Sequence, residues 1–241
     1  MNILIVDTCG ATGSVALAES AQVLASATLP GRTASERLVP AIRELAARAG
    51  LSLSSLGAIA VVHGPGSFTG VRVGLSAAKG LCHALGVPLV AISRLAVLAR
   101  LVQSGLPHSS QSHRDEWGPI HALLDAGRGE FYLGVYRDGL CLREALLTRD
   151  RLLSALSLEP APIVVACESA VAESLAGDAT LRLLHEPTAA DALPLAIRRI
   201  QEQQFDDIAT LDANYLRRTD AEIFAKPAAA RVAAQTRKGE I

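Results

Sequence analysis

An uninterrupted apolar run, Ala58-Ile59-Ala60-Val61-Val62, constrains the fold of this chain more than any other feature. Glycines bound the run and no polar residue interrupts it, which is typical of a strand that is buried on both faces. Such strands usually belong to parallel sheets, in which crossover helices join neighbouring strands. The run therefore predicts an α/β fold.

The segments around this run follow the order expected of an α/β unit. Short β-branched runs predict strands, and apolar residues that recur every three or four positions predict helices. The predicted elements are strands over residues 3–6, 15–18 and 23–29, a helix over 35–49, the apolar strand, a helix over 70–85, a strand over 87–92 and a helix over 95–102.

A second β-led half follows a polar, turn-rich stretch, Ser104–Pro119. Its predicted elements are a meander over residues 120–126, 130–136 and 140–146, a strand over 163–166 and a helix over 189–201. The last residues, 228–241, lack periodicity and predict a frayed or disordered tail. We therefore expect two lobes, residues 1–103 and 104–218, followed by a tail over 219–241.

The composition excludes several classes of protein. Half of the 241 residues are hydrophobic, which excludes wholesale disorder, and the net charge of −1 lacks the basic excess of a chain that binds nucleic acid unaided. No apolar run reaches the length of a membrane span and the first residues lack a signal-peptide pattern, so we expect a soluble, cytoplasmic protein. The four widely spaced cysteines predict ordinary buried thiols.

The residues between the apolar strand and the next helix, His63–Gly70, form a glycine-rich loop. Gly66 and Ser67 stand at the start of that helix, where free backbone N–H groups attract anions. The loop lacks the lysine and the spacing of a P-loop, however. Both a phosphate cradle and a tight structural turn remain open.

Two further strand ends carry a carboxylate beside glycines. Asp7 and Thr8 precede Gly10, and Asp125 precedes Gly127 in the second half. One carboxylate at each of two strand ends could hold a hard cation, although Asp and Gly also simply terminate strands. The candidate nucleotide- or phosphate-binding residues are Asp7, Thr8, Gly66, Ser67 and Asp125.

Other chemistries find little support. No spacing of His108, His113, Asp115 and Glu116 matches a metal-ligand pattern, so these residues predict a solvated loop and no metal site. The chain has no GxSxG or HExxH motif, and Pro187 directly follows His185-Glu186. We expect no catalytic residues in this chain.

Several segments together resemble the bacterial TsaB (YeaZ) family. The segment GPGSFTG-x-R-x-G-L-x-x-A-K-G is the most specific of them. The segments are Met1–Leu17, His63–Ala91, Asp125–Tyr132 and Tyr215-Leu216-Arg217. The resemblance implies a two-lobed actin-like ATPase (ASKHA, ribonuclease H-like) fold with a reduced second lobe. Two positions depart from the family pattern, Cys9 in place of Ser and Ala213 in place of Pro.

The resemblance also implies a role. Members of this family pair with a larger paralogue, TsaD, and with the ATPase TsaE, and the assembly transfers a threonylcarbamoyl group to a tRNA adenosine beside the anticodon. The paralogue carries a His-x-x-x-His metal pair, where this chain has Arg94 and Leu98. Neither side chain replaces an imidazole ligand. The resemblance thus implies a non-catalytic partner subunit that needs no cofactor of its own, reaches tRNA only through the complex, and leaves ATP or ADP at the complex junction open.

In the family the first two helices form the partner interface, here about residues 35–49 and 70–85. The expected contact residues are the apolar stripes of these helices. They are Leu38, Ile42, Leu45, Val71, Gly74, Leu75, Ala78 and Cys82. The same stripes could instead face the chain's own sheet, which is their usual fate. The same surface could also form a homodimer when the paralogue is scarce.

Two other functions remain open on the sequence. One is a Mg-ATP-dependent phosphotransferase that uses Asp7, Thr8, Gly66 and Asp125. The other is a glycoprotease, which needs a metal or nucleophile centre that the sequence does not offer.

Overall fold

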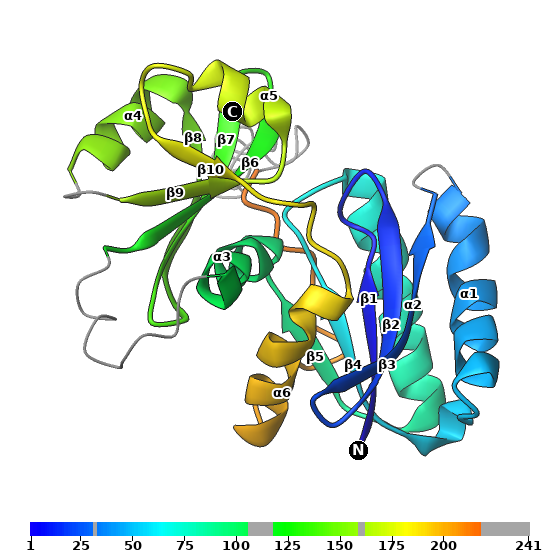
Figure 1. Ribbon diagram of the computed structural model, residues 1–241. Coiled ribbons are helices and arrows are strands. Elements are labelled where there is room, and N and C mark those ends of the chain that lie inside the picture. The colour runs from blue at the N-terminus through cyan, green and yellow to red at the C-terminus, as the bar shows by residue number, and fades with distance from the viewer. Residues whose placement is uncertain (31–32, 106–117, 159–161, 218–241) are drawn as a thin grey trace, which may run out of the picture.

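The computed structural model describes residues 1–30, 33–105, 118–158 and 162–217, which form two lobes (Figure 1). Each lobe is built on a mixed five-stranded sheet with helices beside it. The expected α/β, two-lobed architecture is therefore confirmed. The expected tail over 219–241 and most of the stretch 104–119 lie outside the described residues.

The first sheet has the strand order β3-β2-β1-β4-β5. Its strands are β1 (Asn2–Asp7), β2 (Gly13–Glu19), β3 (Gln22–Leu29), β4 (Leu56–Val62) and β5 (Leu89–Ile92). The first three form an antiparallel meander, whereas β4 pairs in parallel with β1 and with β5. The apolar run that predicted a doubly buried strand is fully buried in β4. Because β1 and β4 run in parallel, Asp7 and Val62 end at the same edge of the sheet.

The second sheet has the strand order β10-β9-β6-β7-β8. Its strands are β6 (Ile120–Gly127), β7 (Glu130–Arg137), β8 (Leu140–Thr148), β9 (Ile163–Ala166) and β10 (Leu181–Leu183). The sequence predicted all of these strands except the three-residue β10. Two short helices also belong to this lobe, α4 (Arg149–Ser157) and α5 (Ser169–Ser174).

Helices cover both faces of the first sheet. Helices α1 (Ala34–Arg48) and α2 (Phe68–Leu85) lie along one face. Helix α6 (Leu193–Gln201) and the short 3-10 helix η4 (Ala190–Ala192) lie on the other (Figure 1). The remaining 3-10 turn, η2 (Leu53–Ser55), leads into β4. Helix α2 begins at Phe68, two residues before the predicted start, because Ser67 serves as its N-cap.

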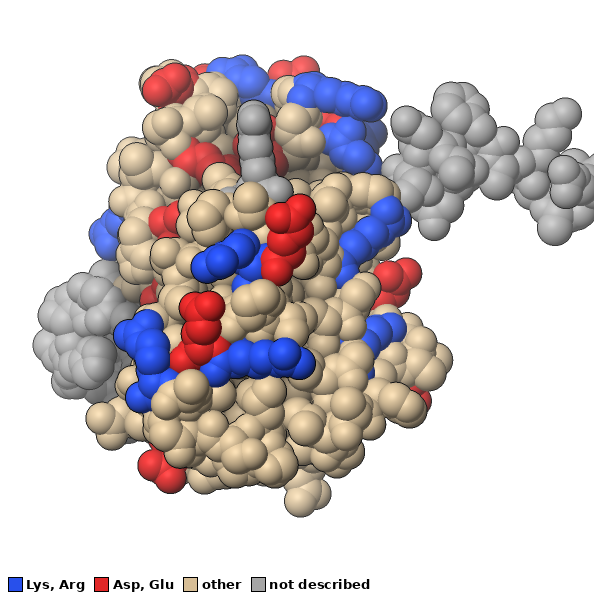
Figure 2. Space-filling view, turned by 90° about the vertical axis from the view of Figure 1, so that its right-hand side faces the viewer, with Lys and Arg blue, Asp and Glu red and all other residues tan. Residues whose placement is uncertain are grey.

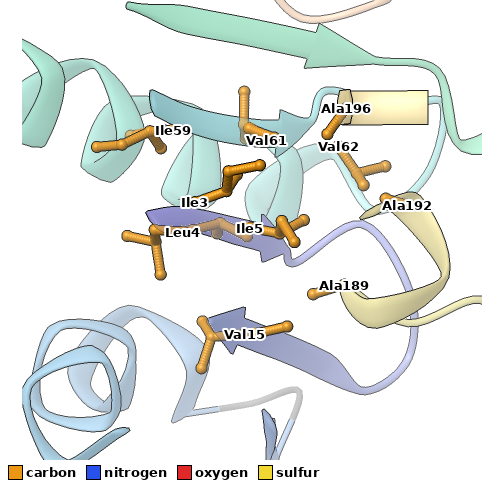
Figure 3. Close-up of a cluster of buried hydrophobic side chains, with 14 of the residues drawn as sticks. Ile3, Leu4, Ile5, Val15, Ile59, Val61, Val62, Ala189, Ala192 and Ala196 are labelled. Carbon is orange, nitrogen blue, oxygen red and sulfur yellow. The ribbon is translucent and has the colours of Figure 1, made fainter. Parts of the chain in front are cut away.

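The division between the lobes differs from the expected one. Ala189, Ala192 and Ala196 belong to the core of the first lobe, where they face the side chains of β1, β2 and β4 (Figure 3). Helix α3 (Arg94–Gly105) packs mainly on the second sheet, where Leu95 and Leu98 are buried against Ile120. The expected boundary at residue 103 therefore falls inside α3, and the expected boundary at 218 lies outside the described residues. Helical periodicity predicts an apolar face but does not say which sheet that face covers.

The cysteines are less uniform than expected. Cys9 and Cys82 are buried as predicted, whereas Cys141 is exposed on β8 and Cys167 is half-buried. Burial raises the pKa of the Cys82 and Cys167 thiols to about 11. Within the described ranges, no helix is long and apolar enough to cross a membrane.

Candidate functional site

The glycine-rich loop packs directly against the tip of the β1–β2 hairpin. A Cβ atom on Gly66 would lie within 3.0 Å of the Cys9 carbonyl oxygen, and one on Gly70 would lie as close to the Thr8 carbonyl oxygen. The backbone N–H of Ser67 donates to Cys9 O at 2.8 Å, and the Thr8 hydroxyl donates to Gly70 O at 2.6 Å. The glycines are therefore needed for close approach of two backbone segments, which favours the tight structural turn over an open phosphate cradle.

Asp7 ends β1, next to the contact between the glycine-rich loop and the hairpin tip, and is only 2% exposed. Its Oδ1 accepts a hydrogen bond from the backbone N–H of Cys9 at 2.8 Å. Burial raises the pKa of the Asp7 carboxyl above its usual value, and the nearby Arg94 guanidinium opposes part of that rise. Asp7 thus has internal partners and does not face the space between the lobes.

The positively charged guanidinium of Arg94 lies near the Asp7 carboxyl, and Arg94 is only 3% exposed. Its Nη2 forms an ion pair with Glu186 Oε1 at 2.9 Å, and the same oxygen accepts from the backbone N–H of Ala11 at 2.8 Å. The interaction ties the hairpin tip of the first lobe to the segment that leads into η4. Arg94 Nε is buried without a hydrogen-bond partner among the described residues.

These groups do not fit a divalent cation. A permanent guanidinium charge next to Asp7 repels a metal ion, and Leu98, the other position expected to align with a metal ligand, is fully buried and apolar. Among the residues that the structure describes, no group of three or more His, Cys, Asp or Glu side chains is placed to hold a metal. A Mg-ATP-dependent reaction through Asp7 therefore has no support in the geometry.

A cavity of about 420 Å³ lies between the lobes, and Arg94 forms part of its wall. It is lined by Cys9, Gly10, Ala11, Gly66, Ser67, Arg94, Leu124, Asp125 and Glu168. Three of the five candidate nucleotide-binding residues, Gly66, Ser67 and Asp125, therefore line one space, whereas Asp7 and Thr8 do not. Glu168 Oε2 accepts from the backbone N–H of Asp125 at 2.6 Å, and burial raises the pKa of the Glu168 carboxyl. The lining holds two carboxyl groups and one guanidinium, that of Arg94, which is already paired with Glu186, so the cavity is unfavourable for a phosphate.

A second cavity of about 470 Å³ opens between the start of α2, the β6–β7 hairpin and the last described residues. It is lined by Pro65, Gly66, Phe68, Val71, Ala126, Arg128, Tyr132, Asn214, Tyr215 and Arg217. Apart from Gly66, no residue of this lining was predicted to bind a ligand. The sequence did offer weaker signals. Phe68 belongs to the glycine-rich loop, Arg128 and Tyr132 belong to the segment Asp125–Tyr132, and Tyr215 and Arg217 belong to a motif to which no role had been assigned.

Glu144 joins the two lobes at a polar seam. The Glu144 carboxylate, on β8, accepts from Asn214 Nδ2 at 2.6 Å and from the hydroxyls of Ser93 and Tyr136. His63 lies near this seam, and burial lowers the pKa of its imidazole although Asp206 and Glu144 favour the charged form. The sequence did not single out Glu144 or its donors Ser93, Tyr136 and Asn214, because the donors come from three distant segments.

The expected partner-contact residues do not lie on the surface. Leu38, Ile42 and Leu45 of α1, with Val71, Gly74, Leu75, Ala78 and Cys82 of α2, are all buried within the chain. The prediction that these side chains touch a partner is wrong, because the apolar stripes of both helices face the first sheet. The outward faces carry other residues, among them Val39 at 42% exposure and Gly80, beyond whose Cβ position the space is open. On this side of the molecule, Lys and Arg side chains alternate with Asp and Glu (Figure 2).

Two lobes that each begin with an antiparallel meander and continue into parallel strands define the class of the protein. It has the two-lobed actin-like ATPase fold. The sequence model of one protein family, described as TsaD: tRNA N6-adenosine threonylcarbamoyltransferase, matches residues 28–225. The chain therefore belongs to this family and, with the relatives described next, to its TsaB (YeaZ) members.

Curated relatives carry the name tRNA threonylcarbamoyladenosine biosynthesis protein TsaB. That of Bacillus subtilis (strain 168) is 34% identical over 160 residues, which are 66% of this chain and 65% of the relative. That of Escherichia coli (strain K12) is 34% identical over 137 residues, 57% of this chain and 55% of the relative. The matched part of the chain thus spans between about half and two thirds of these relatives.

Two solved structures from Pseudomonas aeruginosa share the fold over nearly their full lengths. One, described as an uncharacterized protein with similarity to peptidase YEAZ, has a TM-score of 0.73 at 28% identity and covers 90% of this chain and 99% of its own. The other, YeaZ, has a TM-score of 0.70 at 28% identity and covers 87% of this chain and 98% of its own.

Proposed function

We propose that this chain is a non-catalytic subunit for the synthesis of threonylcarbamoyladenosine in tRNA, and that it acts by binding a TsaD-like catalytic paralogue in the cytoplasm. The names of the curated TsaB relatives support the pathway. A TsaE-like ATPase would join the same complex, and this chain would reach tRNA through the complex.

The observation that carries the non-catalytic role is the burial of Arg94. A catalytic site of this fold needs a cation or an activated water between the lobes, and here a guanidinium with an internal carboxylate partner stands next to Asp7. Because arginine stays charged at every accessible pH, no change of protonation frees that space. A paralogue that retains its metal ligands would have to supply the chemistry.

The outward faces of α1 and α2 are the surface that we assign to the partner. Ser76, Gly80 and Ala84 follow one another at four-residue spacing on α2, and all three are exposed. Small residues at this spacing let another helix approach closely. Exposed charges on α1, among them Arg43 and Glu44, would then lie at the rim and set the orientation of the partner. The same face would form a homodimer when the paralogue is absent.

The test is co-elution of the full chain with the TsaD-like paralogue of the same organism. Gly80→Arg places a long charged side chain on the assigned face and should abolish the complex. It should not unfold the chain, because the site is open and arginine favours helix over glycine by about 0.8–1 kcal/mol. Gln201→Arg, on the exposed end of α6, is the matched control and should co-elute like the unmodified chain. Co-elution of both variants would exclude this face as the interface.

A further inference from the structure

The outer edge of β3 differs from the other sheet edges of the molecule. The first sheet ends in β3 and β5, and the second sheet ends in β8 and β10. The outward backbone N–H and C=O groups of an edge strand can pair with a strand of another chain, so proteins normally block their edges. In this chain three of the four edges are blocked, and that of β3 is not.

Each of the three blocked edges has its own device. At β5, the Asp206 backbone N–H donates to Leu89 O at 2.9 Å, and Asp206 Oδ2 accepts from the Ala91 N–H at 2.6 Å. Strand β10 has only three residues and includes the exposed Arg182. Strand β8 carries the exposed Arg143 beside a bulge in its pairing with β7. Covering segments, short strands, charges and bulges all oppose strand addition.

The edge of β3 is open over five residues. Among the residues that the structure describes, no strand pairs with its outer edge. Its sequence, QVLASATL, contains neither a charged residue nor a proline. The pairing with β2 skips Leu24, which forms a bulge, and Pro30, which follows the strand, has no N–H to donate. Residues 25–29, between the bulge and the proline, therefore form a regular and uncharged edge.

This open segment is symmetric about Ala27. Leu24 and Pro30 lie three residues to either side of Ala27. If a second copy pairs antiparallel with the two Ala27 residues opposite each other, each bulge lies opposite the proline of the other copy, and both strands stop pairing at the same points. A two-fold axis through the Ala27 pair makes the two contributions identical, as a closed dimer requires. The position of the two stop signals therefore favours a second copy as the occupant.

The side chains suit the same register. Ser26 and Thr28 are exposed, whereas Ala25 and Ala27 lie on the other face and are partly buried against the core. With the Ala27 residues opposite each other, Ser26 of each copy faces Thr28 of the other. Serine and threonine in directly opposed positions of antiparallel strands stabilise the pair through hydrogen bonds between their hydroxyls. No like charges oppose each other, because the strand has none.

We propose that two copies of this chain pair antiparallel through residues 25–29 of β3 and join their first sheets into one continuous sheet. Residues that face each other across antiparallel strands lie on the same face of a sheet, so the two-fold axis is perpendicular to the sheet. Helix α1 packs on β3 and β2 (Figure 1), so the helices of both copies lie on the same side of the joined sheet. The outward faces of α1 and α2 stay available, and the pairing predicts an assembly with two copies of this chain.

The experiment is sedimentation equilibrium of the full chain with Gly80→Arg, which removes association through the helix face. We expect the mass of two chains, because β3 is unchanged in this variant. If the Gly80→Arg chain keeps the mass of one copy at concentrations up to about 0.1 mM, where even a weak specific interface is populated, the proposal is overturned.

Two double substitutions in the Gly80→Arg chain test the register. Ser26→Lys with Thr28→Lys places like charges opposite each other and should weaken self-association at least about tenfold. Ser26→Lys with Thr28→Glu places a lysine opposite a glutamate and should restore the dimer. Both positions are exposed, so circular dichroism should show the same folded chain in each case. A dimer that survives the two lysines, or a monomer with lysine and glutamate, would contradict the proposed pairing.

The paralogue separates this proposal from that of the partner surface. Without Gly80→Arg, the chain with Ser26→Lys and Thr28→Lys should still co-elute with the TsaD-like paralogue, because the helix face is unchanged. Its complex should contain one copy of this chain, whereas that of the unmodified chain should contain two. Loss of the paralogue from this variant would assign the β3 edge to the partner and overturn the pairing of two copies. Failure of the pairing alone leaves the partner proposal untouched.

Discussion

Single side chains decide what the space between the lobes accepts, and Arg94 is the clearest case. Its charge is buried and pairs with Glu186, while Asp7 lies close enough to feel its field. A buried group of opposite charges adds little to the free energy of unfolding, because removing the charges from water costs about as much as their attraction gains. Removing one of them is costly, however, because the remaining charges are then buried without an opposite partner. The cleft therefore depends on Arg94 for its stability, although Arg94 prevents it from holding a metal ion.

Replacing Arg94 tests this dependence. Arg94→Met keeps most of the volume but leaves Asp7 and Glu186 without their cation, so the free energy of unfolding should fall by about 3–5 kcal/mol. Urea denaturation followed by circular dichroism measures the change. Arg37→Met, at an exposed position of α1, should change the stability by less than about 0.5 kcal/mol. An equal, small effect of both substitutions would show that the buried pair does not stabilise the cleft.

His63 makes the stability depend on pH. Burial lowers the pKa of its imidazole below the usual 6.5, so below that pH the unfolded chain takes up a proton that the folded chain excludes. The free energy of unfolding should therefore fall as the pH drops from about 7.5 to about 5.5, and His63→Gln should reduce that fall. Urea midpoints at the two pH values give the comparison. His83→Gln, at the exposed end of α2, should keep the full fall, and an unchanged fall in His63→Gln would contradict the role of this burial.

At the scale of the element, the sequence pattern of α2 correctly predicted a helix. It did not predict that the apolar face of this helix is buried against the chain's own sheet. Apolar residues at positions such as Val71, Leu75 and Ala78 recur at the helical period, and that period is all that a single sequence contains. The first sheet already covers this face, so the proposed partner surface lies among small and charged residues, which the pattern of apolar residues does not mark. The loop before α2 was predictable for a similar reason, because its glycines mark a close approach. Which backbone approaches was not, since the hairpin tip lies some sixty residues away along the chain.

Two glycines of α2 provide a matched pair. A Cβ on Gly74 would collide with the Thr8 hydroxyl, whereas a Cβ on Gly80 meets open space. Gly74→Ala should therefore lower the thermal midpoint, and Gly80→Ala should raise the stability by roughly 0.5–1 kcal/mol through helix propensity. Differential scanning calorimetry of both variants distinguishes them. A gain in stability from Gly74→Ala would show that α2 and the β1–β2 hairpin pack less closely at Thr8 than the structure indicates.

At the scale of the whole molecule, the two lobes are tied together by segments that cross between them. Helix α6 and the residues before it return from the second lobe to cover the first sheet, and Glu144 connects β8 to Ser93 and Asn214. The order of most elements was predictable, because each meander and each longer helix has its own local pattern, whereas the short elements α4, α5 and β10 were not predicted. The return of residues 189–213 was not, because it is decided by which apolar surface remains uncovered once both sheets exist.

The proposed division of labour between this chain and a TsaD-like paralogue can be measured in a reconstituted transfer reaction. Unmodified tRNA is incubated with a threonylcarbamoyl donor and with this chain alone, the TsaD-like paralogue alone, or both, and the modified nucleoside is quantified by mass spectrometry. We predict strong product formation only when both proteins are present, and its loss when Gly80→Arg replaces the unmodified chain. Product formed by this chain alone would contradict a non-catalytic role.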